Sequence, residues 1–288
     1  VNAGAMTNKG VEFTLNTRNI LTHDFTWTSG LTFSINRNEV TKLYSESSAI
    51  SGINGNETLT YTMVGEPVGQ FYGYKVIGMF KEESDFYKKD ADGNFQLDEA
   101  GNRIRIAIPK GQQISKNGIW VGDYIYEDLH EDGVIDEKDR TFLGNPAPKF
   151  TFGFNNYFAY KGFDLNIFLN GSVGNKAVNL IRRTFTDPMR NSNLLKEATD
   201  IALIGMHDPE VGDEELSNVY IVNADRAKVQ RVTTSSANDN NRISSRFIED
   251  ASYLRIKNIS LGYTFPRKWL RHLQIDNIRL YVNIQNLC

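Results

Sequence analysis

The stretch FTFGFNNYFAYKGFDLNIFLNGSV, residues 150–173, alternates apolar and polar residues on both sides of Lys161-Gly162. Successive side chains of a β-strand point to opposite faces, so this alternation predicts two strands that each have one apolar and one polar face. The two-residue Lys-Gly link between them is typical of a tight hairpin turn. We therefore expect an antiparallel hairpin over residues 150–160 and 163–173.

The same alternation recurs in other segments, at residues 11–18, 25–36, 253–265 and 278–287, whose polar faces are rich in Asn, Thr and Ser. Strands of about ten residues are longer than the five or six that are usual in soluble proteins. A soluble β-sandwich is the alternative, because its strands alternate as well. Long strands with a polar lumen face and an apolar lipid face are typical of membrane barrels. The sequence thus predicts an all-β, antiparallel transmembrane β-barrel segment.

The connections between the predicted strands are alternately short and long. Residues 40–148 and 174–251 form the long ones. Outer-membrane barrels have short periplasmic turns and long extracellular loops, so we expect these two segments to be extracellular loop regions. Within the second, LIRRTFTD and LLKEATDIALIG predict short helices, and the polar SSANDNN at residues 235–241 predicts a mobile tip.

Aromatic residues gather at the strand ends that face the short turns, which predicts one of the two interfacial girdles of a barrel. They are Phe25, Trp27, Tyr160, Phe163, Tyr263 and Phe265. Arg255 and Lys257 share the parity of apolar Ile259. Strict alternation therefore predicts them on the lipid face near the outer rim, either solvated or in contact with lipopolysaccharide phosphate.

Composition excludes several classes of function. The net charge of −3 gives no reason to expect a nucleic-acid partner. The single cysteine, Cys288, excludes an internal disulfide framework, and no long apolar run predicts a transmembrane helix. No P-loop, G-x-S-x-G or H-E-x-x-H motif occurs, so we expect no enzyme activity.

Because the chain starts at Val1 without a signal peptide and stops directly after a strand pattern, we expect a fragment.

The segment DLHEDGVIDEKD, residues 128–139, has the spacing of a calcium-binding loop. Counted from its first residue, carboxylates fall at positions one, five, nine and twelve, with Gly at six and a backbone carbonyl at seven. The candidate ligands for a possible Ca²⁺ are Asp128, His130, Asp132, Val134, Asp136 and Asp139. His at position three and Asp in place of the usual bidentate Glu depart from the pattern. An Asp-Gly-rich turn that holds no metal is the alternative.

The polar faces of the predicted strands supply candidate substrate contacts, because amides and rings that face the lumen could hydrogen-bond to or stack on a sugar. The candidates are Asn155, Tyr157, Asp164, Asn166, Asn170, Arg279, Tyr281 and Asn283. The alternative is that these side chains only hydrate the wall or contact a plug.

Four stretches of the chain carry a family resemblance in their order and spacing. They are GEPVGQFYGYKVIGMF (65–80), residues 122–175, SYLRIKNISLGYTFP (252–266) and LYVNIQNL (280–287). Together they resemble the C-terminal barrel region of SusC/RagA-type TonB-dependent outer-membrane transporters.

The resemblance implies a plugged barrel of about 22 strands in the outer membrane of a Gram-negative bacterium. It implies import of large nutrients, glycan oligosaccharides or peptides, with a SusD-type surface lipoprotein as lid and energy from the TonB complex. Residues 1–288 would then be a partial barrel of about six strands, without the N-terminal plug and the C-terminal end. Lipid and lipopolysaccharide would surround it.

Two other functions stay open. One is a soluble surface glycan-binding β module with a calcium-braced loop, which would need a second sheet to bury the apolar face. The other is a siderophore- or cobalamin-type TonB-dependent receptor, which shares the barrel but normally lacks a segment like residues 128–139.

Overall fold

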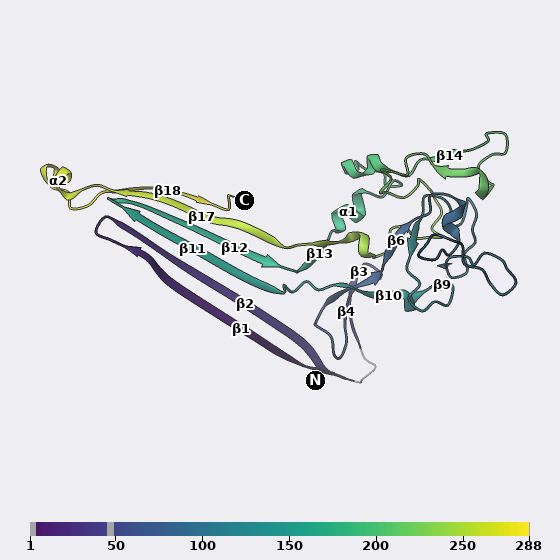
Figure 1. Ribbon diagram of the computed structural model, residues 1–288, viewed down its shortest axis with the longest axis horizontal. Helices are drawn as coiled ribbons and strands as arrows, with labels where there is room; N and C mark the ends of the chain where they lie inside the picture. The colour runs from purple at the N-terminus through teal and green to yellow at the C-terminus, as the bar shows by residue number, and fades with distance from the viewer. Residues whose placement is uncertain (1–3, 45–48, 288) are drawn as a thin grey trace.

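The computed structural model describes residues 4–44 and 49–287. Cys288 lies outside the described residues. The chain forms two parts, a long sheet of six strands and a compact unit at one end of it (Figure 1). We refer to the sheet as the wall and to residues 50–148 and 174–251 as the head.

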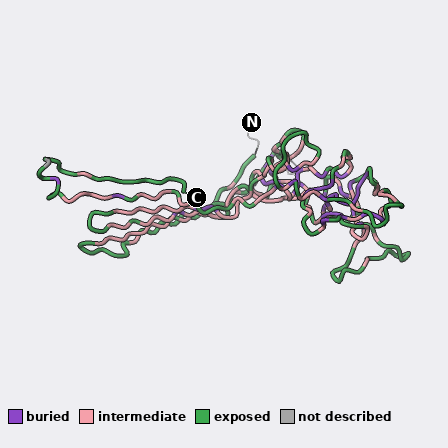
Figure 2. The backbone as a smooth tube through the Cα atoms, turned by 90° about the horizontal axis from the view of Figure 1, so that it is seen from above, coloured by how far each residue is buried: buried purple, intermediate pink, exposed green. Residues whose placement is uncertain are grey.

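The wall contains six antiparallel strands in the order β1-β2-β11-β12-β17-β18. They are β1 (Gly4–Leu21), β2 (Phe25–Leu43), β11 (Phe150–Tyr160), β12 (Phe163–Val173), β17 (Tyr253–Thr264) and β18 (Arg279–Gln285). Viewed from above, they form a single layer with no second sheet over either face in the described chain (Figure 2). The predicted antiparallel barrel strands are therefore confirmed as one continuous sheet.

The hairpin formed by β11 and β12 has the bounds that the sequence predicts. Lys161 and Gly162 both have positive φ, 45° and 93°, as a type I′ turn between twisted strands requires. Strands β1 and β2 extend beyond the alternating residues, since their pairing continues to Gly4 opposite Leu43. Backbone hydrogen bonds hold this outer part together where the alternation of side chains has ended.

A bulge in β17 changes the predicted orientation of its outer half. Register with β12 shifts between Phe168 and Leu169, so Ile256 pairs with Leu169 and Arg255 pairs with Asn170. An extra residue on one strand reverses the face of every side chain beyond it. The prediction that Arg255 lies on the apolar face is therefore wrong, because it shares the polar face with Asn170.

The head contains a four-stranded sheet in the order β10-β5-β4-β3 and several short strand pairs. The sheet consists of β3 (Ile50–Asn54), β4 (Glu57–Thr62), β5 (Gln70–Tyr74) and β10 (Arg140–Gly144). The pairs are β6 (Val76–Met79) with β8 (Tyr124–Tyr126), β7 (Ile108–Pro109) with β9 (Val134–Ile135), β13 (Lys176–Val178) with β16 (Ile248–Asp250), and β14 (Ile204–Met206) with β15 (Val219–Ile221).

Helices are short throughout. They are α1 (Leu180–Phe185), α2 (Arg267–Leu270), and the 3₁₀ turns η1 (Glu83–Phe86), η2 (Glu137–Asp139), η3 (Lys196–Asp200), η4 (Leu216–Asn218), η5 (Ser245–Phe247) and η6 (Arg271–Leu273). Over the described residues, no helix is long and apolar enough to cross a membrane.

The two long connections fold into one unit with a shared hydrophobic core. Phe80, Trp120 and Tyr124 from the first connection pack with Val219 and Ile221 from the second. Burial of this kind is the main favourable term in folding, so each connection depends on the other for its core.

The predicted mobile tip is instead part of that unit. Asn238 and Asn240 are buried, and their side-chain amides donate to Tyr124 O at 3.0 Å and to Asp123 Oδ1 at 2.9 Å. Polar residues at the end of a long connection usually contact solvent. Here they satisfy buried backbone and carboxylate acceptors, so the prediction of mobility is wrong.

Candidate functional site: the polar face of the wall

The predicted lumen-facing residues lie on one face of the wall. Residues directly opposite one another in antiparallel strands share a face. Tyr157 pairs with Asn166, Asn166 with Ser260, and Ser260 with Asn283, which forms one polar row across four strands. Neighbouring rows contain the other candidates, which are Asn155, Asp164, Asn170, Arg279 and Tyr281.

An ion pair spans the face between Asp164 and Arg279. Arg279 Nε donates to Asp164 Oδ1 at 3.1 Å, and its guanidinium carbon lies 5.2 Å from the centre of the Tyr281 ring. The pair crosses β17 at Gly262, where a Cβ would lie 2.6 Å from Asp164 Oδ1 and 2.5 Å from Arg279 Nη2. The glycine therefore leaves the space in which strands β12 and β18 connect through their side chains.

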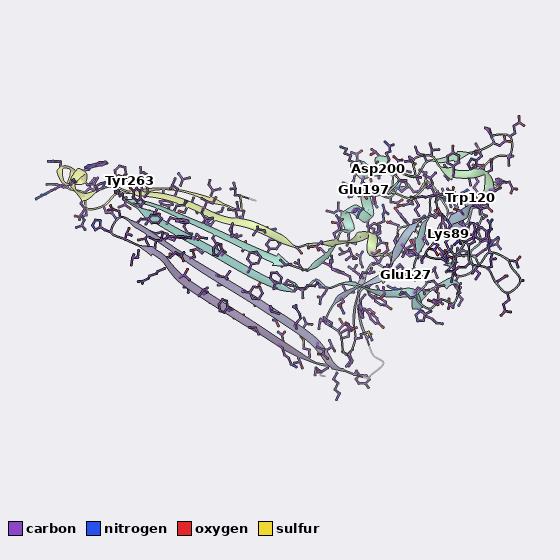
Figure 3. All side chains as sticks on the ribbon, viewed as in Figure 1. Lys89, Trp120, Glu127, Glu197, Asp200 and Tyr263 are labelled. Carbon is purple, nitrogen blue, oxygen red and sulfur yellow. The ribbon has the colours of Figure 1, made fainter. Side chains whose placement is uncertain are left out.

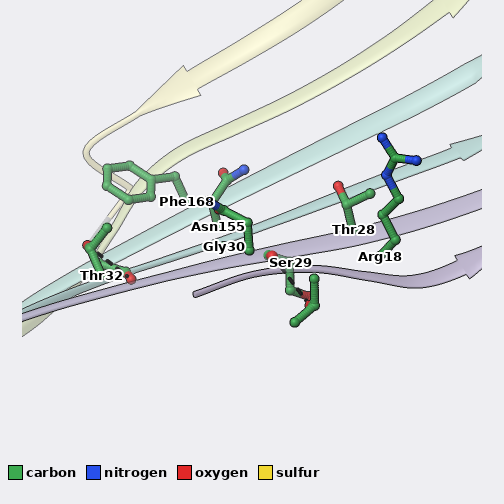
Figure 4. A pocket seen from close by; sticks show the side chains of 10 residues that line it. Arg18, Thr28, Ser29, Gly30, Thr32, Asn155 and Phe168 are labelled. Carbon is green, nitrogen blue, oxygen red and sulfur yellow. Dashed lines mark hydrogen bonds between the residues drawn. The ribbon is translucent and has the colours of Figure 1, made fainter. Parts of the chain in front are cut away.

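A hollow of about 410 Å³ opens on the same face beside β1 and β2 (Figure 4). Its lining comprises Asn16, Thr17, Arg18, Thr28, Ser29, Gly30, Thr32, Gly153, Asn155 and Phe168. Of the sequence candidates only Asn155 is included. Phe168 was not among the predicted lumen-facing residues. It shares the parity of Asn166 and Asn170, so the sequence alone could have placed this aromatic ring on the polar face.

Two side-chain oxygens on this face have unused hydrogen-bonding capacity. Asn170 Oδ1 and Asn258 Oδ1 are buried and have no hydrogen-bond partner among the described residues. Buried acceptors without a partner are costly, so each needs water or a group from outside the wall. The polar face thus combines charge, aromatic rings and free acceptors, which suits a hydrated, polar cargo.

The opposite face of the wall is apolar and uncovered. Val11, Leu261 and Leu280 expose 66%, 50% and 63% of their surface. At the end away from the head, Trp27 stacks on Phe158 with ring centres 5.8 Å apart. Tyr263 lies at that end of the wall, whereas Trp120 and Glu197 lie in the head at the other end of the molecule (Figure 3). A wide apolar face without a covering layer suits contact with lipid.

One polar network interrupts the apolar face near the aromatic girdle. Asn156 Oδ1 accepts hydrogen bonds from Trp27 Nε1 at 3.1 Å and from Ser29 Oγ at 2.8 Å. Ser29 Oγ in turn accepts from Asn19 Nδ2 at 2.7 Å. Polar groups that satisfy one another cost less at a lipid-facing surface than unpaired ones do.

In the candidate calcium loop, the Asp carboxylates accept hydrogen bonds from backbone N–H groups of the same loop. Asp128 Oδ2 accepts from Gly133 N at 3.0 Å, and Asp139 Oδ1 accepts from Leu129 N at 2.9 Å. Asp136 is the N-cap of η2, and its Oδ1 accepts from Lys138 N at 2.8 Å. Gly133 has φ of 82°, the left-handed conformation that glycine adopts without strain.

The fit of this loop to a cation is partial. Asp128 Oδ1 is buried without a hydrogen-bond partner in the described chain, and such an acceptor suits a cation. By contrast, Asp132 Oδ1 accepts from Val134 N at 3.1 Å, and His130 Nδ1 lies 3.7 Å from Asp139 Oδ1. No group of three or more His, Cys, Asp or Glu side chains that could hold a metal occurs among the residues described. Metal binding would require the carboxylates to turn inward.

No family model matches the chain. TonB-dependent receptor P3 of Formosa agariphila is 31% identical over 290 residues, covering 99% of this chain and 24% of the relative. TonB-dependent receptor P26 of the same organism is 30% identical over 290 residues, covering 99% and 25%. TonB-dependent receptor SusC of Bacteroides thetaiotaomicron is 23% identical over 286 residues, covering 99% and 23%. The chain spans about a quarter of the length of these relatives.

Solved structures agree on the fold. The RagAB peptide transporter matches with a TM-score of 0.68 at 21% identity, covering 100% of this chain and 26% of that chain. The RagAB peptide importer in its 'closed-closed' state matches with a TM-score of 0.61 at 20% identity, again over 100% and 26%.

The chain is therefore similar in sequence to part of several TonB-dependent receptors and in fold to part of the RagAB peptide transporter. Among TonB-dependent receptors, the chain is similar to the SusC/RagA type. These relatives are named as receptors and a peptide transporter.

Proposed function

We propose that the chain forms part of the wall of a TonB-dependent outer-membrane transporter that imports large nutrients, oligosaccharides or peptides. One observation carries this proposal, a single-layered sheet with an uncovered apolar face and a polar opposite face. Such a sheet fits between lipid and a hydrated lumen. A soluble glycan-binding module would need a covering layer, and no sheet covers the wall in the described chain.

The head is the part that we assign to the cell exterior and to contact with a SusD-type lipoprotein. Both long connections leave the wall at the same end, opposite the short turns (Figure 1). The relatives named SusC and RagAB support this assignment. The polar residues of the wall would then contact cargo or plug, and energy would come from the TonB complex through parts outside residues 1–288.

The orientation can be tested on intact cells that express the full-length receptor with Cys288→Ser as background. Leu97 in the head is 57% exposed, and the side chain of His23 in the first short turn is 98% exposed. We expect Leu97→Cys to react with a membrane-impermeant maleimide on whole cells. His23→Cys should react only after the outer membrane is permeabilised. Labelling of both, or of His23→Cys alone, on intact cells contradicts the proposal.

The cargo class can be tested by growth. A strain that lacks the receptor is compared with its parent on oligosaccharides and on peptides as the sole carbon source. A growth defect on one class, restored by the full-length receptor, supports import of that class. Unimpaired growth on both would contradict the transport function.

We also propose that residues 128–139 bind Ca²⁺ weakly at the cell exterior. The buried oxygen of Asp128 and the tight turn at Gly133 support this. We expect millimolar Ca²⁺ to raise the melting temperature of the full-length receptor, as in the weak extracellular class of such loops. Asp128→Asn should abolish the effect, whereas the control Asp90→Asn, in another exposed turn, should keep it. An equal response of both variants contradicts calcium binding at this loop.

A further inference from the structure

A second hollow, of about 400 Å³, lies where the wall meets the head. Its lining comes from the outer half of β2, from the segment that precedes β11, from the residue after β12 and from the start of β13. Three cationic side chains from separate segments line it, Arg37, Lys149 and Lys176. No acidic side chain lines it in the part of the chain that the structure describes.

Two glycines shape this hollow around the lysines. At Gly174, with φ of 84°, a Cβ would lie 2.6 Å from Lys149 Cγ. At Gly144, with φ of 151°, a Cβ would lie 2.5 Å from Lys176 Cγ. Each lysine stem therefore packs on bare backbone that only glycine can provide at these backbone angles. This packing restricts the stems of two lysines that line the same hollow.

The charge in the hollow is only partly compensated. Lys176 Nζ lies 3.2 Å from Asp250 Oδ2, but Arg37 and Lys149 form no ion pair with any described residue. Hydrogen bonds from Ser252 and Lys176 lower the pKa of the Asp250 carboxyl to about 2, so this acid is ionised at neutral pH. Glu39 and Glu66 are near in sequence but do not line the hollow.

Backbone contacts hold the guanidinium of Arg37 over the hollow. Its Nη1 donates to Asn36 O at 2.9 Å and to Pro148 O at 3.3 Å. The remaining guanidinium donors and the two ammonium groups have no carboxylate partner other than Asp250 in the described chain. Three cationic side chains line the hollow and only Lys176 is paired with an acid, so positive charge is in local excess.

We propose that this hollow is a binding site for a tetrahedral oxyanion, a phosphate or sulfate group. Lysine and arginine bind such groups through charge-assisted hydrogen bonds. The oxyanion belongs either to a lipid A phosphate in the outer leaflet or to a solute that enters the barrel. The hollow shares no lining residue with the hollow on the polar face described above.

Binding can be measured by titrating the full-length receptor, stripped of lipopolysaccharide, with inorganic phosphate and with sulfate at low salt. We expect Lys149→Met and Lys176→Met each to weaken binding about tenfold, the effect of losing one hydrogen bond to a charged group. Lys149→Arg should retain it. The control Lys268→Met, in α2 at the opposite end of the wall, should bind like the unchanged receptor. Equal melting temperatures would show that all variants fold.

The source of the oxyanion is distinguished in nanodiscs that contain either bisphosphorylated or dephosphorylated lipid A. Preference for the bisphosphorylated form, lost in Lys149→Met, assigns the site to the lipid. Binding of inorganic phosphate without that preference assigns it to a solute. Absence of phosphate, sulfate and lipid A binding, or equal binding by all variants, overturns the proposal.

Discussion

Gly262 is the residue on which the ion pair between Asp164 and Arg279 depends. The two charged side chains are 115 positions apart in sequence and come from strands that are not neighbours. Any other residue at 262 would place a Cβ within 3 Å of both. Glycine in a strand interior normally weakens the strand, so its presence here has a packing reason.

We therefore predict that Gly262→Ala slightly destabilises the full-length receptor, despite the better strand propensity of alanine. The effect is small because Arg279 is partly exposed, and solvent screens an exposed ion pair. The control is Gly78→Ala, where the Cβ would meet only Ile125 Cδ1 at an ordinary 3.6 Å. Thermal unfolding measures both, and a stabilised Gly262→Ala would contradict the prediction.

At the scale of the element, strand β12 has one apolar face and one polar face. Ile167 lies on the apolar face, paired with Ile259, and its neighbour Asn166 lies on the polar face, paired with Ser260. These two positions are adjacent in sequence and similar in depth. They therefore separate the effect of facing lipid from the effect of position along the strand.

We predict that Ile167→Lys reduces the folded fraction of the full-length receptor in the outer membrane, because a lysine facing lipid near the midplane costs about 2–4 kcal/mol. Asn166→Lys should insert normally, since a lumen-facing charge stays hydrated. Folded receptor is measured by its heat-modifiable migration on a gel. Equal folding of both variants would show that the face of Ile167 is not in contact with lipid.

At the scale of the whole molecule, a buried ion pair joins the two long connections in addition to their shared hydrophobic core. Arg231 of the second connection lies 2.9 Å from Asp123 of the first, and their side chains are only 6% and 1% exposed. Arg231 also donates to Lys116 O at 2.9 Å and to Gly118 O at 2.8 Å. The pair thus satisfies a carboxylate and two carbonyls inside the head.

We predict that Arg231→Met destabilises the head by about 3–5 kcal/mol, because it leaves the buried carboxylate of Asp123 without a counter-charge. Limited proteolysis of the full-length receptor should then cleave both connections faster, while the wall stays intact. Arg105→Met, at an exposed position of the head, is the matched control. Cleavage confined to the second connection would mean that the two connections do not depend on each other.

The alternating residues were sufficient to predict the wall. Period-two patterning is a local property, so residues 150–160 and 163–173 showed their strands, their faces and their turn directly. The resemblance to SusC/RagA-type transporters likewise depended on contiguous stretches. Lumen candidates such as Tyr157 and Asn166 were placed on one face by parity alone.

Features that depend on contacts between distant segments are seen only in the tertiary structure. The bulge opposite Phe168 moves Arg255 to the polar face, and strict parity cannot show where one strand gains a residue relative to another. The burial of Asn238 and the pairing of Asp123 with Arg231 join connections more than 100 residues apart. The alternation of the wall is encoded locally, whereas the bulge, the head and the cationic hollow arise where separate segments meet.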